Sequence, residues 1–188
     1  MDVILKYFPN LSKDKIEKLE ATYDIYENWN AVINLISRKD FQNFHTNHLL
    51  HSLSILSFFK FNNGTTFLDV GTGGGFPGIP LAICLDNCNF TLNDSIAKKI
   101  KVVEDVALQL SLSNVSCINS RVEQIHQKFD FVTGRAVTAL PDFVSLVKDK
   151  VSTNNRNELN NGIIYLKGGD FQNEIDLLKH KTKVFDLF

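Results

Sequence analysis

Apolar residues along the chain form two alternating patterns: short continuous runs, and longer stretches in which apolar positions recur every three or four residues. The short runs predict buried strands and the longer stretches predict amphipathic helices. The predicted strands are residues 66–70, 90–93, 115–119, 129–133, 162–167 and a sixth that begins at residue 184. The helices between them are expected over residues 79–85, 100–110, 140–150 and from 168 to about 181. This alternation predicts an α/β fold with a doubly wound, mostly parallel sheet that binds its ligand at the carboxyl ends of the strands.

Two further helical stretches precede the first strand, over residues 11–36 and 41–59. The turn-forming sequence Asn62-Asn63-Gly64 separates them from the strand. We therefore expect an N-terminal helical extension over residues 1–61. The core domain is expected over residues 62–188, with its C-terminal strands incomplete.

Three histidines, His45, His48 and His51, recur at a spacing of three in the second of these helical stretches. No carboxylate stands at a matching position, and a zinc site needs mixed, convergent ligands. We expect solvated or interface histidines and no metal site.

Glycines crowd the junction after the first strand, where they occupy four of the five positions 71–75, directly after Asp69-Val70. An apolar helical pattern then begins, so the segment is expected to run from strand through tight turn to helix. A phosphate-binding P-loop is excluded, because no lysine stands beside Gly78. The dinucleotide fingerprint, and with it a nicotinamide oxidoreductase, is disfavoured, because Phe76 occupies the third glycine position.

The motif that fits is acid-x-Gly-x-Gly-x-Gly, formed by Asp69, Gly71, Gly73 and Gly75. This loop is typical of Rossmann-like, class I methyltransferases, which use S-adenosylmethionine. That ligand carries a sulfonium and an ammonium group, so an acid beside the loop is favourable. Asp94 ends the second strand, near the ~20-residue spacing expected of an acid that binds ribose hydroxyls. A cap for the helix that follows is the alternative role for Asp94.

Composition limits the class of protein and its partners. The 188 residues are 44% hydrophobic and 22% charged, as in an ordinary soluble domain, and no apolar run is long enough to span a membrane. Three cysteines without CxxC spacing, and a start that lacks signal-peptide features, lead us to expect reduced thiols in the cytoplasm. Because the net charge is −1, RNA binding would need a local basic patch. Candidate phosphate contacts are Lys98, Lys99, Lys101, Lys148, Lys150 and Lys167.

Several segments together resemble one family, the ribosomal RNA small subunit methyltransferase G family, over nearly the whole chain. The most specific is the Gly-Phe-Pro-Gly-Ile-Pro block at residues 75–80. The others are Asp69–Gly75, Thr91–Ser95, Ser120–Glu123, Gly134–Val137, Leu166–Gly168, and Trp29-Asn30 with Asn34–Ile36. The sequence departs from the family at His51, where many members have Asp, and at its end, where the last two strands are not complete.

The resemblance implies an S-adenosylmethionine-dependent enzyme that methylates N7 of guanosine 527 in 16S rRNA. Its partner would be 16S rRNA or a precursor of the small ribosomal subunit. The implied cofactor-binding residues, taken from the family and from the loop motif, are Gly71, Gly73, Phe76, Asp94, Val122, Glu123 and Arg135.

The residues near the expected site agree with attack by N7, whose in-plane lone pair needs no base. The fourth strand is followed by Gly134-Arg135, not by the Asn/Asp-Pro-Pro-aromatic turn of amino-methylating enzymes, and no cysteine stands there as a nucleophile. Catalysis would rest on positioning. Arg135 could hold the methionine carboxylate or an RNA phosphate. Two alternatives stay open: a methyltransferase with a small-molecule or protein acceptor, and a cofactor-binding module that contacts RNA without methyl transfer.

Overall fold

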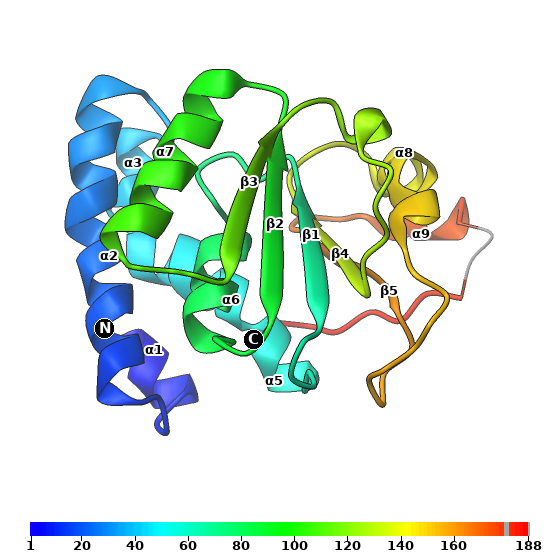
Figure 1. Ribbon diagram of the computed structural model, residues 1–188, viewed down its shortest axis with the longest axis horizontal. Helices are drawn as coiled ribbons and strands as arrows, with labels where there is room; N and C mark the ends of the chain where they lie inside the picture. The colour runs from blue at the N-terminus through cyan, green and yellow to red at the C-terminus, as the bar shows by residue number, and fades with distance from the viewer. Residues whose placement is uncertain (179–180, 188) are drawn as a thin grey trace.

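The computed structural model describes residues 1–178 and 181–187, which form a parallel five-stranded sheet between helical layers (Figure 1). The strand order is β3-β2-β1-β4-β5. The strands are β1 (Thr66–Val70), β2 (Asn89–Asp94), β3 (Val115–Asn119), β4 (Phe131–Arg135) and β5 (Gly162–Leu166). All four pairings are parallel, which confirms the predicted α/β fold.

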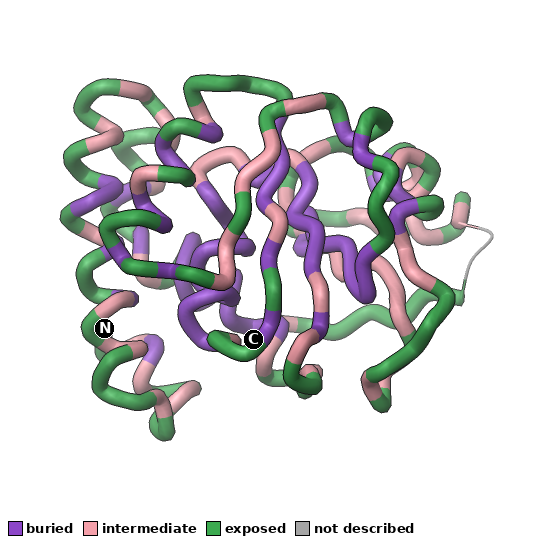
Figure 2. The backbone as a smooth tube through the Cα atoms, viewed as in Figure 1, coloured by how far each residue is buried: buried purple, intermediate pink, exposed green. Residues whose placement is uncertain are grey.

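The centre of the sheet is buried on both faces, as Figure 2 shows for β1 and its neighbours. Phe67 of β1 pairs in register with Phe90 of β2 and with Phe131 of β4. The ring centroids of Phe67 lie 4.6 Å from those of Phe90 and 5.6 Å from those of Phe131. Cross-strand aromatic pairs stabilise neighbouring strands, so this row of rings helps to fix the register.

One face of the sheet carries α6 (Gly78–Cys84) and α7 (Ala97–Gln109), with α2 (Lys13–Val32) packed outside them. The Lys15 ammonium donates to the Cys84 carbonyl at 2.8 Å, and the Trp29 indole donates to Asp105 Oδ2 at 2.7 Å. The N-terminal helices therefore share one hydrophobic core with this face.

Helix α2 ends four residues earlier than residue 36, the end that its apolar spacing predicted. The Asn30 side chain accepts from the backbone N–H groups of Leu35 and Ile36 and donates to the Ile36 carbonyl. These bonds fold the chain back on the helix, because an Asn side chain offers the backbone an alternative to helical hydrogen bonding. A short helix, α1 (Asp2–Tyr7), precedes α2.

The single helix predicted over residues 41–59 is wrong. The segment is divided into α3 (Arg38–Phe41), the π-helical η1 (His45–Leu50), α4 (His51–Leu53) and α5 (Ile55–Phe58). Ser52 and Ser54 donate to backbone carbonyls within it, each at 2.6 Å, and such bonds bend helices. Within the π-helical η1, the side chains of His48, Leu49 and Leu50 are buried.

The opposite face of the sheet is covered by α8 (Leu140–Val147), which continues into the 3₁₀ turn η3 (Lys148–Lys150). A second 3₁₀ turn, η2 (Val122–Gln124), follows β3. Strand β4 begins and ends two residues later than predicted, since Phe129 forms only an isolated bridge to Val151. Arg135 is therefore the last residue of the strand and not part of the loop after it.

The C-terminal segment has less regular structure than its apolar pattern predicted. Helix α9 (Gln172–Asp176) is shorter than the expected 168–181, of which residues 179–180 lie outside the described residues. Within 181–187 there is no strand, so the sixth strand predicted from residue 184 is absent there; Phe188 lies outside the described residues. Instead, Phe185 packs on Phe58 and Phe59, with centroid distances of 4.9 and 5.2 Å. No helix in the described part of the chain is both long and apolar enough to span a membrane.

Candidate functional site

The glycine loop connects β1 to α6 at the carboxyl edge of the sheet. Gly71, Gly73 and Gly75 have φ angles of +64°, +60° and +93°, in the left-handed region that disfavours other residues. A Cβ atom at Gly71 would lie 2.9 Å from the Val137 side chain, whereas one at Gly73 would have no neighbour nearer than 3.9 Å. The loop is therefore packed from behind at Gly71 and open at Gly73, where a ligand has room to approach the backbone.

Asp69 holds this loop from the protein interior. Its fully buried carboxylate accepts from the hydroxyls of Thr72 and Thr133, at 2.6 and 2.9 Å, and from the backbone N–H of Gly78 at 3.1 Å. Burial outweighs these bonds and raises the pKa of Asp69 to about 6. Sequence reasoning placed an acid beside a cationic ligand, but the structure places this one behind the loop as its anchor.

The raised pKa makes folding stability depend on pH. The folded protein keeps a proton on Asp69 at pH values where the unfolded chain, with a pKa near ~3.9, has lost it. The stability linked to Asp69 should therefore be greatest below about pH 4 and fall by roughly 2–3 kcal/mol as the pH rises to about 6. Urea unfolding at each pH, compared between wild type and Asp69→Asn, measures this fall as the difference between the two curves. Parallel curves would contradict it.

In a dinucleotide-binding loop, the third glycine allows the helix to pack closely on the strand. Here Phe76 occupies that sequence position, and Gly78 allows the close packing. A Cβ at Gly78 would lie 2.2 Å from Leu92 Cδ2, so α6 packs on β2 through this glycine. Phe76 is buried and turned toward the N-terminal helices, where its ring centroid lies 4.9 Å from that of Tyr26. The Tyr26 hydroxyl also donates to the Gly74 carbonyl at 2.5 Å. Sequence reasoning missed Tyr26, because nothing in its helical spacing distinguishes it from an ordinary core residue.

Asp94 lies directly against the glycine loop. One carboxylate oxygen accepts from the Gly73 backbone N–H at 3.0 Å, and the other accepts from the Ile96 N–H at 2.9 Å. The side chain thus connects the glycine loop to the turn that precedes α7. It lies beside both the loop, where a ribose would bind, and the start of the helix that it could cap. Its role toward a ribose stays a prediction.

Val122 and Glu123 belong to η2, which follows the carboxyl end of β3, and β3 is the neighbour of β2 in the sheet. Val122 is buried, and Glu123 is exposed. Nearby, the Ser120 hydroxyl is buried and has no hydrogen-bond partner among the described residues. A buried hydroxyl without a partner fits a place where a polar ligand binds.

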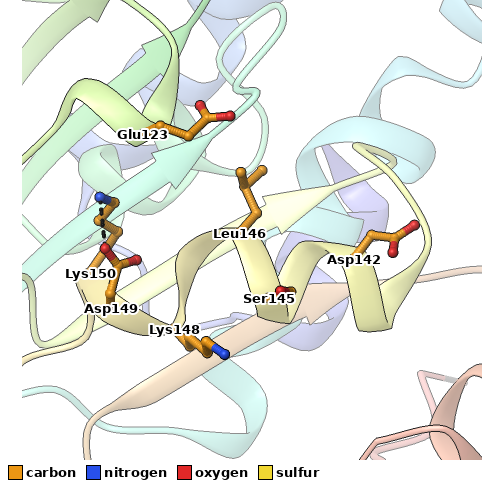
Figure 3. A pocket seen from close by; sticks show the side chains of 7 residues that line it. All are labelled: Glu123, Asp142, Ser145, Leu146, Lys148, Asp149 and Lys150. Carbon is orange, nitrogen blue, oxygen red and sulfur yellow. Dashed lines mark hydrogen bonds and ion pairs between the residues drawn. The ribbon is translucent and has the colours of Figure 1, made fainter.

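A shallow cleft separates Glu123 from α8 and η3, and Figure 3 shows the side chains that line it. None of the glycine-loop residues takes part in it. Lys150 reaches into the protein here, is buried, and bonds Asp149 at 3.1 Å. Of the six candidate lysines for RNA phosphates, Lys150 is therefore inaccessible, and Lys167 is paired with Glu174 at 2.6 Å.

Arg135 points from the end of β4 toward η1. Its Nη1 donates to the Asn47 carbonyl and its Nη2 to His48 Nδ1, both at 2.9 Å, and the guanidinium lies 5.3 Å from the centroid of the Phe76 ring. Burial lowers the pKa of Arg135, although an arginine remains charged at neutral pH. The structure buries His48, which sequence reasoning expected to be solvated or at an interface. The spacing of the histidines was visible in the sequence, but their link to Arg135 was not.

The structure thus brings Gly73 and Asp94 into contact, and Arg135 and Phe76 as well, at the carboxyl ends of β1, β2 and β4, where Gly71 also lies. Val122 and Glu123 follow β3, and Glu123 lines the separate cleft beside α8 and η3. Among residues 1–178 and 181–187, no group of three His, Cys, Asp or Glu side chains is arranged to hold a metal ion.

Comparison with known proteins gives one consistent result. The model of the family described as rRNA small subunit methyltransferase G matches residues 15–186. The ribosomal RNA small subunit methyltransferase G of Flavobacterium johnsoniae is 54% identical over 175 residues, which cover 93% of this chain and 84% of that protein. The protein of the same name from Christiangramia forsetii is 48% identical over 188 residues, covering 100% of this chain and 88% of that protein.

A solved structure from Methanococcus maripaludis, assigned to the S-adenosyl-L-methionine-dependent methyltransferases, aligns with a TM-score of 0.50 at 13% identity. The alignment covers 61% of this chain and 57% of that one, and it shows the shared fold alone. The family assignment rests on the sequence relatives: the chain belongs to the rRNA small subunit methyltransferase G family.

Proposed function

We propose that this protein transfers a methyl group from S-adenosylmethionine to N7 of a guanosine in 16S rRNA, the guanosine 527 that the family resemblance implies. The observation that carries the proposal is the loop of three left-handed glycines, with the Asp94 carboxylate against it, in a member of this family. The acceptor would be 16S rRNA or a precursor of the small subunit, in the cytoplasm.

The residues that would hold the cofactor follow β1 and β3 or end β2 and β4. Gly71 and Gly73 would let it approach the loop backbone, and Phe76 would fix the end of that loop. Asp94 would accept from the ribose hydroxyls after giving up its bond to Gly73. Val122 and Glu123, which follow β3, would line one side of the cofactor site. The open space at Gly73 and the unpartnered Ser120 hydroxyl fit a ligand of this kind.

When bound, S-adenosylmethionine supplies an electrophilic methyl group on a sulfonium. Guanine N7 attacks through a lone pair that carries no proton, so the protein needs no general base. No cysteine lies at the end of β4 or β5, where a nucleophile for carbon methylation would be expected. Arg135 should leave N7 free, since an arginine bonded to that atom would block the reaction. The contribution of the protein is then proximity and orientation.

The test uses the fixed positive charge that N7 methylation puts on the guanine ring. Borohydride reduces such a ring, and aniline then cleaves the RNA at that nucleotide. We expect one cleavage in 16S rRNA from wild-type cells, in an accessible loop, because A-form RNA hides N7 in a deep groove. The cleavage should vanish when the gene is deleted and return with the wild-type gene.

Three outcomes would contradict the proposal. Cleavage that persists in the deletion strain would assign the methyl group to another enzyme. Methylation at another atom or on another acceptor would favour a different methyltransferase. Cofactor binding without transfer to ribosomal particles or rRNA would indicate a binding module.

A further inference from the structure

A chain of hydrogen bonds connects Arg135 to the N-terminal helices through one histidine. Arg135 Nη2 lies 2.9 Å from His48 Nδ1, and His48 Nε2 lies 2.7 Å from Asp40 Oδ2. Asn47 supports both ends: its carbonyl accepts from Arg135, and its side-chain amide donates to Asp40 Oδ1 at 2.6 Å.

The donor groups in this series of hydrogen bonds determine the protonation state and tautomer of the His48 imidazole. An arginine side chain has donors only, so His48 Nδ1 must accept and cannot carry a proton. The proton then lies on Nε2, from which it is donated to the Asp40 carboxylate. His48 is therefore neutral and in a single tautomer, which Asp40 selects.

The same contacts leave Arg135 able to bind an anion. Its two described hydrogen-bond partners, a carbonyl and a neutral imidazole, carry no charge, and no carboxylate forms an ion pair with it in the described part of the chain. Only two of its five N–H donors are used by these partners. A guanidinium that is oriented but not neutralised can still form charge-assisted bonds with a carboxylate or phosphate.

We infer that Asp40 and His48 act as positioning residues, which hold Arg135 in the orientation that binds the anionic end of the cofactor. This inference rests on the proposed function, since it takes the methionine carboxylate as the ligand of Arg135. It makes η1 part of the cofactor site, although this segment lies far from the glycine loop in the sequence.

Several titratable groups lie around the histidine; Arg135 and Asp40 act on its titration directly, whereas Asp69 and Tyr26 act on Arg135. They are Asp40 on α3, His51 on α4, Arg135 on β4, and, beyond Arg135, Asp69 on β1 and Tyr26 on α2. Burial and the nearby Arg135 lower the pKa of His48, so the neutral form is kept at neutral pH. Protonation at lower pH would replace the acceptor facing Arg135 with a donor and a second positive charge.

The test separates hydrogen bonding from packing with two substitutions at one position. His48→Phe keeps a ring against Phe44 and Phe76 but removes both hydrogen bonds. His48→Asn restores an acceptor oxygen near the position of Nδ1. The matched control is His45→Phe on the same π-helical turn, because the His45 ring stacks on Tyr23 and not on Arg135.

Calorimetry with S-adenosylmethionine should show a Kd about tenfold weaker in His48→Phe, within about threefold of wild type in His48→Asn, and unchanged in His45→Phe. The wild-type Kd should weaken as the pH falls toward 5, and this dependence should be smaller in His48→Asn. Equal losses in both His48 variants, or near-normal binding by a folded His48→Phe, would overturn the inference. Wild-type protein that binds no cofactor would instead overturn the proposed function, and the role of Asp40 and His48 with it.

A second measurement does not depend on how the variants fold. Long-range ¹H–¹⁵N correlation spectra of wild-type protein labelled at histidine report which ring nitrogen carries the proton. We expect His48 to carry it on Nε2 at pH 7, with Nδ1 unprotonated. The opposite tautomer would overturn the inference.

Discussion

Gly71→Val is expected to abolish binding of S-adenosylmethionine, with a Kd at least about a hundredfold weaker than that of wild type. Gly71 has a φ angle of +64°, which a β-branched residue strongly disfavours. Its Cβ would also lie 2.9 Å from Val137, which covers the back of the loop. The backbone would have to move at the point where the ligand approaches. Titration calorimetry on the folded variant measures the loss.

Two comparisons make this result specific. Gly162→Val, at the start of β5, has room for a Cβ and no positive φ, so it should bind the cofactor normally. Asp94→Ala should weaken binding less than Gly71→Val, by about tenfold or more, because it removes one charged hydrogen-bonding group while Asp69 still anchors the loop through Thr72 and Gly78. Near-normal affinity in a folded Gly71→Val protein would show that the loop is not the cofactor site.

Gly78→Ala is expected to destabilise the fold by about 3 kcal/mol or more, the upper range for overpacking a core. The added methyl group would lie 2.2 Å from Leu92 Cδ2 and 2.9 Å from the Asp69 carboxylate. Leu92 is fully buried, so relief of this contact either displaces its packed side chain or moves α6 away from β2, which would lengthen the bond from the Gly78 N–H to Asp69. Urea denaturation measures the change in the free energy of unfolding.

The partner of this contact offers a check by double-mutant cycle. Leu92→Val shortens the side chain that the new methyl group meets, so the double variant should be less destabilised than the sum of the single variants. Gly74→Ala is the matched control, because a Cβ there would meet the rings of Phe76 and Tyr26 at 3.5 and 3.8 Å, which are ordinary contact distances. Additive effects of Gly78→Ala and Leu92→Val would contradict the packing explanation.

The sheet could be predicted from the sequence because buried parallel strands are continuous apolar runs. The predicted range of β1 agrees with the structure residue for residue, and that of β3 does too. The range of β4 was wrong by two residues at each end, since Phe129 forms only an isolated bridge and Gly134 and Arg135 belong to the strand. The strand keeps this glycine because a Cβ there would meet Phe143 of α8 at 2.5 Å.

The site was predictable only where its residues belong to a local sequence motif, namely a strand, a glycine-rich turn and an acid at the end of the next strand. The hydrogen-bonding connections of Arg135 to His48 and of Tyr26 to Gly74 join residues far apart in the chain. Periodicity does not reveal such pairs, because His48 and Tyr26 each have the apolar spacing of an ordinary helix residue. The π-helical turn that presents His48 was likewise invisible, since its apolar spacing fits a regular helix.

The bond between Trp29 and Asp105 has a practical consequence. Trp29 is the only tryptophan of the chain, and it lies where α2 meets α7. Its fluorescence therefore comes from a single, known contact, while circular dichroism reports the backbone as a whole. Together, the two signals can distinguish release of α2 from melting of the sheet, without any introduced label.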